Sequence, residues 1–206
     1  MKPLIEQIIL LCTVLLVFIS SNIPGCVMPG CIHGSGNYTS ENRTVDNFSS
    51  IDLSGIGDVY LTQEKKHLRI EAEDNIIQEI KTEVGGRKLT IYHKARCINP
   101  HMPIKIFVST PELESLSISG SGRIISQSPI DSKALNLRVS GSGNMELDSV
   151  CQDLQAVISG SGTALLKGEA ARSEIVISGS GSMHGYDLQT DRSRVIISGS
   201  GIAEIY

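Results

Sequence analysis

Residues 156–166 read AVISGSGTALL, and this stretch decides the fold of the chain. Its tetrapeptide Ser-Gly-Ser-Gly, at 159–162, also occurs at 119–122, 140–143, 178–181 and 198–201, so that successive copies lie 21, 19, 19 and 20 residues apart. A near copy, Ser54-Gly55-Ile56-Gly57, lies upstream. One tetrapeptide repeated at an almost constant spacing indicates a repeat architecture.

Aliphatic residues flank each copy at alternate positions, which is the period of a β-strand. Around residues 159–162 they are Ala156 and Ile158 before the glycines, and Ala164 and Leu166 after them. Each unit therefore predicts a strand, a glycine corner, a second strand and a variable connection.

A unit of this length is typical of one coil of a β-solenoid, in which successive coils stack as parallel strands. We predict an all-β, parallel β-helix-like solenoid of about six coils with an elaborated N-terminal coil. Glycine suits the corners because a sharp bend uses backbone angles closed to residues with a Cβ. Serine side chains are expected to pass hydrogen bonds from coil to coil. The expected corner residues are Ser54, Gly55, Gly57, Ser119, Gly120, Gly122, Ser140, Gly141, Gly143, Ser159, Gly160, Gly162, Ser178, Gly179, Gly181, Ser198, Gly199 and Gly201.

Two other architectures fit the repeat less well. A propeller would need about 40 residues per blade, twice the observed unit. A flat antiparallel meander would use glycine turns, but it would not need the same corner at every second strand.

The stretch between Gly57 and Ser119 lacks the repeat and is expected to elaborate the first coil. Residues 67–73, 88–93 and 103–109 alternate like strands, whereas residues 75–84 carry apolar side chains at a helical spacing and predict one or two helical turns. An inserted hairpin or helix here would cap the open end of the solenoid.

Composition narrows the function classes. The chain has 206 residues and a formal net charge of −4, with 40% hydrophobic but only 4% aromatic residues. The core must therefore be aliphatic. A slightly acidic chain carries no basic footprint for nucleic acid, so no nucleic-acid partner is expected.

Residues 1–25 predict a signal peptide or signal anchor because of the apolar run 8–19. Ile23, Gly25 and Cys26 resemble a lipoprotein processing box, which would make Cys26 the site of lipid attachment. The alternative is an uncleaved anchor. Either way, we expect an exported protein on the outer face of a membrane, with residues 26–42 as a linker and residues 43–206 as the domain.

Cysteines and sequons are compatible with export. Cys31, Cys97 and Cys151 allow at most one disulfide and leave one thiol, and Cys151 is expected to be a small buried residue in a strand. Three N-glycosylation sequons begin at Asn37, Asn42 and Asn47.

Several segments resemble a known family: residues 43–45, 51–53, 57–59, 71–75 and 89–91, followed by the Ser-Gly-Ser-Gly repeats. Over about residues 34–206 the chain is similar to the "putative auto-transporter adhesin, head GIN domain" family. The resemblance implies a right-handed parallel β-helix-like fold on an exported, often lipid-anchored protein, and it brings no catalytic residues. It also implies a closing segment that this sequence does not show after Tyr206, which leaves two alternatives: a domain truncated at its C-terminus, or an end covered by a partner.

No catalytic or cofactor motif stands out, so we predict a non-enzymatic surface module that binds a protein or glycan through weak, multivalent contacts. It has no expected cofactor or metal, because the five histidines show no zinc spacing. One alternative is a polysaccharide-acting enzyme with an acidic stripe made of Asp131, Asp148, Glu169 and Asp187. The other is a sensory or regulatory ectodomain.

Overall fold

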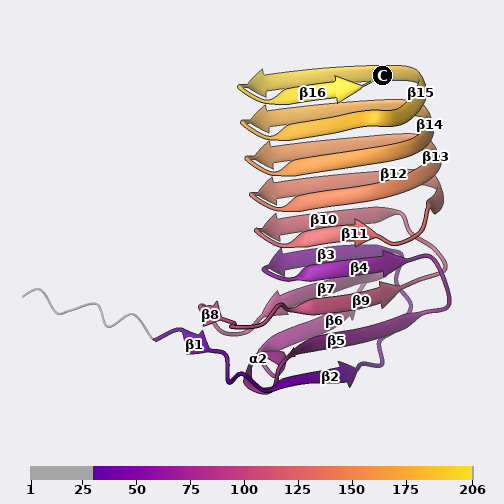
Figure 1. Ribbon diagram of the computed structural model, residues 1–206. Helices are drawn as coiled ribbons and strands as arrows, with labels where there is room; N and C mark the ends of the chain where they lie inside the picture. Colours follow the sequence, from indigo (N-terminus) through magenta and orange to yellow (C-terminus); the bar gives the residue numbers. More distant parts are fainter. Residues whose placement is uncertain (1–29, 206) are drawn as a thin grey trace, which may run out of the picture. The chain divides into compact units, whose positions relative to one another are not determined.

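The computed structural model describes residues 30–205, and nearly all regular structure in them is β-strand (Figure 1). The strands before the first Ser-Gly-Ser-Gly corner are β1 (Ile32–His33), β2 (Tyr38–Asn42), β3 (Ser50–Gly55), β4 (Asp58–Thr62), β5 (His67–Glu73), β6 (Ile80–Gly85), β7 (Lys88–His93), β8 (Ile98–Asn99) and β9 (Lys105–Ser109). The later strands are β10 (Ser115–Gly120), β11 (Arg123–Ser126), β12 (Ile130–Gly141), β13 (Asn144–Gly160), β14 (Thr163–Gly179), β15 (Ser182–Gly199) and β16 (Ile202–Ile205). The described helix is the short α2 (Asp74–Ile77).

The predicted parallel solenoid is confirmed. Strands β3, β10, β12, β13, β14 and β15 pair in parallel, and their register stacks each corner glycine on the next. The curled sheet makes about five turns, against the roughly six coils expected. Because these pairs are parallel, the flat antiparallel meander is excluded.

The corners are joined by backbone contacts. Gly160 has φ +116°, and a Cβ placed there would lie 2.6 Å from the carbonyl oxygen of Gly141 in the turn below. The amide of Ser161 donates to that same oxygen at 2.9 Å, and the amide of Thr163 donates to the Gly143 oxygen at 3.1 Å. Only glycine can adopt this φ while its backbone lies this close to the carbonyl oxygen of the turn below.

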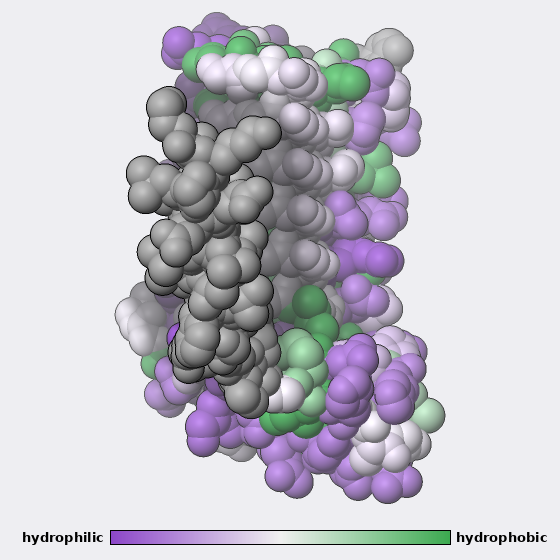
Figure 2. All heavy atoms as spheres, turned by 90° about the vertical axis from the view of Figure 1, so that its left-hand side faces the viewer, coloured by the Kyte–Doolittle hydropathy of each residue, from purple (hydrophilic) through white to green (hydrophobic). Residues whose placement is uncertain are grey.

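The serine ladder expected at the corners does not form among the described residues. Corner side chains such as those of Ser142 and Ser161 are exposed, so water competes for their hydroxyl groups, and backbone amides make the links between turns. Figure 2 faces the corner side and shows pale residues of near-neutral hydropathy stacked turn upon turn where that side is uncovered.

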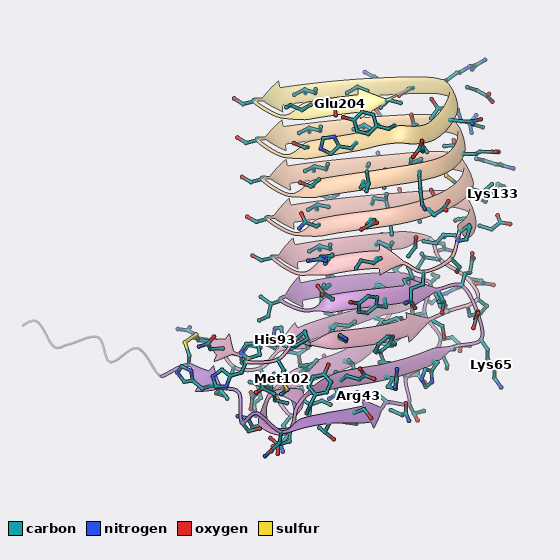
Figure 3. All side chains as sticks on the ribbon, in the orientation of Figure 1. Arg43, Lys65, His93, Met102, Lys133 and Glu204 are labelled. Atoms are coloured by element: carbon teal, nitrogen blue, oxygen red, sulfur yellow. A yellow bond between two sulfur atoms is a disulfide. The ribbon has the colours of Figure 1, made fainter. Side chains whose placement is uncertain are left out.

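The variable connections expected between strands are replaced by continuous strand in the later turns. Strands β13 and β14 each run 17 residues from one corner to the next and bend on the way. A short connection remains between β11 and β12, at residues 127–129. Each late turn is therefore bent sharply at the glycines and gently at the opposite edge, where Lys133 projects in Figure 3.

Inward side chains stack into aliphatic columns. Ile118, Val139, Ile158 and Ile177 occupy one register column, and each is at most 1% exposed. In the last described turn the next member, Ile197, is 43% exposed. The expected aliphatic core is thus present through the stacked turns.

The N-terminal end is closed by antiparallel strands. Strand β5 pairs antiparallel with β9 and β2, and β6 pairs antiparallel with β7. The prediction of helical structure at residues 75–84 is wrong beyond Ile77, because residues 80–85 form strand β6. Gly86 and Arg87, with φ of +58° and +65°, make a two-residue turn that returns the chain into β7.

A disulfide and a buried carboxylate hold the first described residues. Cys31 is bonded to Cys97, and β1 pairs with β8 beside them. Glu73 is fully buried and accepts backbone N–H bonds from Gly36 at 2.8 Å and His101 at 2.8 Å. Burial acts to raise the pKa of Glu73, but these backbone bonds outweigh it and hold the pKa below its usual value. Strands β1 and β2 fall within residues 26–42, so part of the expected linker is paired into sheets.

Within residues 30–205 no helix has the length and apolar character needed to cross a membrane. The apolar run at 8–19 and Cys26 lie outside the described residues, so the signal, the anchor and the lipid remain predictions.

Replacing one corner glycine tests the stacking. Gly160→Ala places a Cβ against the Gly141 oxygen at a φ that favours glycine, and we expect it to destabilise the fold by at least about 2 kcal/mol. Gly85→Ala is the control, because a Cβ there meets nothing within 4 Å and its φ is not positive. Chemical denaturation measures both. Equal stability of the two variants would contradict the corner geometry.

The disulfide closes a loop with a sequence separation of 66 residues. In the chain-entropy account, its loss in Cys31→Ser/Cys97→Ser costs about 4 kcal/mol of unfolding free energy. Dithiothreitol should lower the denaturation midpoint of the wild-type chain to that of the variant and leave the variant unchanged. An unshifted wild-type midpoint in reductant would show that the bond adds no stability.

Candidate binding groove

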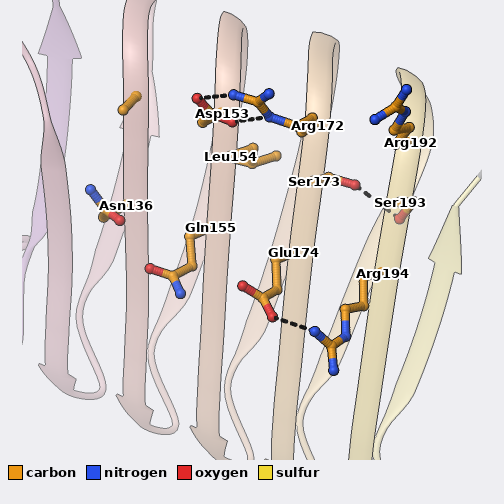
Figure 4. A pocket seen from close by; sticks show the side chains of 11 residues that line it. Asn136, Asp153, Leu154, Gln155, Arg172, Ser173, Glu174, Arg192, Ser193 and Arg194 are labelled. Atoms are coloured by element: carbon orange, nitrogen blue, oxygen red, sulfur yellow. Dashed lines mark hydrogen bonds and ion pairs between the residues drawn. The ribbon is translucent and has the colours of Figure 1, made fainter.

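A groove runs along the outside of the solenoid beside the gentle bends, at the edge away from the glycine corners (Figure 4). It consists of two open hollows of about 520 Å³ each. Ala134 and Asn136 line both hollows, so the two hollows adjoin. We call this feature the bend groove.

Register places the same three positions of every turn in the bend groove. One wall is the column Asn136, Gln155, Glu174 and Arg194. The other wall is the column Ala134, Asp153, Arg172 and Arg192, and between them lie Leu135, Leu154, Ser173 and Ser193. Including residues 113–115 below, the groove spans five layers, or about 19 Å at the spacing of paired strands.

Side chains in the upper part of the bend groove are held by polar contacts (Figure 4). Arg172 donates to both carboxylate oxygens of Asp153, at 2.5 and 2.8 Å. Arg194 lies 3.8 Å from Glu174, and the hydroxyl of Ser173 donates to that of Ser193 at 2.9 Å. Hydrogen bonds from Arg172 lower the pKa of Asp153, so this carboxylate stays charged in mildly acidic solution.

The charge of the lining changes along the bend groove. Its upper part holds Arg172, Arg192 and Arg194 against two carboxylates. Its lower part holds Glu114 and Asp131 against Lys133, and also Glu112, which is ion-paired with Arg87 at 2.5 Å. Within residues 30–205, Arg192 makes no hydrogen bond or ion pair. The groove is therefore positive near β15 and negative near β10.

Sequence reasoning missed the bend groove. Its wall residues show no motif, because their chemistry differs from turn to turn. Aligning the repeats on their corner serines would have found one wall, since Asn136, Gln155, Glu174 and Arg194 each stand four residues before a corner.

The expected acidic stripe is not formed. Asp148 pairs with Lys167 at 3.5 Å, and Asp131 aligns with Val150 in the next turn. Glu169 lines a separate hollow with Gln189. Among the described residues no cluster of three or more His, Cys, Asp or Glu side chains is arranged to hold a metal ion.

The remaining sequence-predicted sites lie away from the bend groove. Asn37, Asn42 and Asn47 are exposed near the N-terminal cap, and their glycosylation stays a prediction. Cys151 is buried in β13 as expected, and its burial raises the pKa of the thiol to about 11. Such a thiol is a poor nucleophile.

Residues 47–206 match the model of the protein family described as "putative auto-transporter adhesin, head GIN domain". No curated protein sequence matches the chain. Several solved structures share its fold, and the three described next are each below 25% identity.

A putative adhesin from Parabacteroides distasonis is 23% identical, with a TM-score of 0.63 over 85% of this chain and 84% of that one. A putative adhesin from Bacteroides fragilis is 18% identical, with a TM-score of 0.63 over 85% of this chain and 100% of that one. A protein from Parabacteroides distasonis described as a putative lipid binding protein is 22% identical, with a TM-score of 0.58 over 86% of this chain and 100% of that one.

The ion pair between Arg172 and Asp153 can be tested by titration. Arg172→Gln removes the guanidinium, so the pKa of Asp153 should rise toward its ordinary value, as followed by carboxyl chemical shifts in NMR. Arg138→Gln, on the same strand system but outside the groove, is the matched control. An Asp153 pKa that is the same in all three proteins would refute the pairing.

Proposed function

The chain belongs to the family of head GIN domains of putative auto-transporter adhesins, and from this we propose that it is a non-enzymatic binding module of the cell surface or envelope. The stacked turns act as a rigid scaffold, and the bend groove is the contact surface for a protein or glycan. The observation that carries the proposal is the groove itself, two adjoining hollows lined by polar and apolar atoms over five neighbouring layers of the solenoid.

Export is supported by the disulfide between Cys31 and Cys97, since such bonds persist in oxidising compartments. Lipid attachment at Cys26, or an uncleaved apolar anchor, would hold the solenoid at the outer face of the membrane. Two proteins with similar structures are described as putative adhesins, which agrees with a binding role.

The chemistry of the bend groove suits many weak contacts. Its wall side chains are amides, carboxylates and guanidinium groups, each planar and able to make paired hydrogen bonds. Exposed polar contacts of this kind are individually weak, but a surface that displays many copies of the protein would bind with high avidity.

Avidity provides the test. Beads coated with the full chain should adhere to envelope fragments of the producing cells, whereas the same protein free in solution should bind at least about 100-fold more weakly. Asn136→Ala/Gln155→Ala should reduce bead retention, because it removes two groove amides.

The matched control is Asn144→Ala/Gln152→Ala, which removes the same two chemical groups from exposed positions outside the groove. Circular dichroism verifies that both variants are folded. Equal retention of the two variants would rule out the bend groove as the contact surface.

A further inference from the structure

We propose that the bend groove takes an extended oligosaccharide whose acidic group lies at the β15 end, against Arg192. This inference rests on the proposed function and names the ligand class. It follows from three properties of the groove: its length, the pairing state of its strands and the position of its unpaired cation.

The groove has the length of an extended chain rather than of a compact molecule. Its five layers span about 19 Å, and both of its hollows are open to solvent. An oligomer lying parallel to the solenoid axis would meet the same wall positions again at each turn.

Strand pairing in the floor disfavours a peptide. Strand β13 is paired on both sides, with β12 and β14, and β14 is paired with β13 and β15. An incoming peptide therefore finds no free strand edge at β13 or β14 to satisfy its backbone. The outer edge of β15 beyond Gly185 is unpaired among the described residues, but it lies only at the end of the groove. The floor also lacks an apolar pocket for side chains, since its apolar residues are small or, like Leu154, 2% exposed.

Sugar hydroxyl groups suit the walls better. Asn136 and Gln155 stand in neighbouring layers with amide groups that both donate and accept, which matches hydroxyl groups on successive sugar rings. Asn136 also donates to the Glu114 carbonyl at 3.3 Å, which orients its amide.

Charge fixes the acidic end of the oligosaccharide. Asp153 and Glu174 are ion-paired with Arg172 and Arg194, whereas Arg192 carries a charge that no described residue neutralises. A carboxylate or sulfate would accept paired hydrogen bonds from this guanidinium. The lower end, where Glu114 and Asp131 have no basic partner among the described residues, repels an anion and disfavours the reversed orientation.

Calorimetry with the full chain tests the inference, using an oligosaccharide with a single terminal uronate and the uncharged oligosaccharide of equal length as probes. The acidic oligosaccharide should bind more tightly, and its affinity should fall as salt is added. Arg192→Gln should weaken it by about tenfold, the worth of one charge-assisted hydrogen bond, and leave the uncharged probe unaffected. Arg138→Gln, an exposed arginine on β12 outside the groove, should change neither affinity.

The outcomes separate this inference from the function on which it rests. Equal binding of both probes, or an Arg192→Gln variant that binds like wild type, overturns the acidic-end assignment. Tighter binding of a peptide of equal length with a single terminal glutamate than of the acidic oligosaccharide overturns the glycan assignment. If neither sugar binds while Asn136→Ala/Gln155→Ala still abolishes bead adhesion, the inference fails and the proposed function stands. If that variant also adheres normally, both fail.

Discussion

Close contact between the backbones of stacked corners is the constraint on which the rest of the structure depends. Gly160 lies over Gly141 at a distance that leaves no room for a Cβ, and Gly179 lies over Gly160 in the same way. This contact fixes the vertical spacing and the register together. With register fixed, every residue of a turn has a set direction, so Ile158 and Ile177 point inward in one column. The aliphatic core and the outer walls both follow from the corners.

The same constraint separates scaffold from site. Inward columns must keep aliphatic side chains of modest size, whereas outward columns contact solvent and can change without cost to the fold. Asn136, Gln155, Glu174 and Arg194 illustrate this freedom, because four different side chains occupy one structural position. A fold of this kind can therefore acquire a charge gradient along its length while its backbone stays the same. Function then lies in the outward columns and not in the fold.

The corners and the strands beside them could be predicted because their signals are local: a glycine pair and a period of two. The region before the repeats was harder. Ile76, Ile77 and Ile80 are all buried, and their spacing fits a helix, but only residues 74–77 are helical. Ile80 instead belongs to the β6–β7 hairpin, which depends on the turn at Gly86 and Arg87. The positive φ of Arg87, a non-glycine residue, has no clear sequence signal. The bend groove could not be foreseen, because the bend between corners carries no repeated glycine or proline: β14 has Gly168 at φ +106°, where β13 has Ser149. The properties of residues 1–29 remain predictions from sequence.

Distances between corners test the central claim most directly. Spin labels placed in pairs at Ser121 with Ser161, Ser180 or Ser200, in a Cys151→Ala background, would report separations by pulsed electron resonance. If the corners form a single file, the separation rises by about 5 Å per turn, to roughly 19 Å between the first and last sites. Separations that do not increase in proportion to the number of intervening turns would contradict the stacked solenoid.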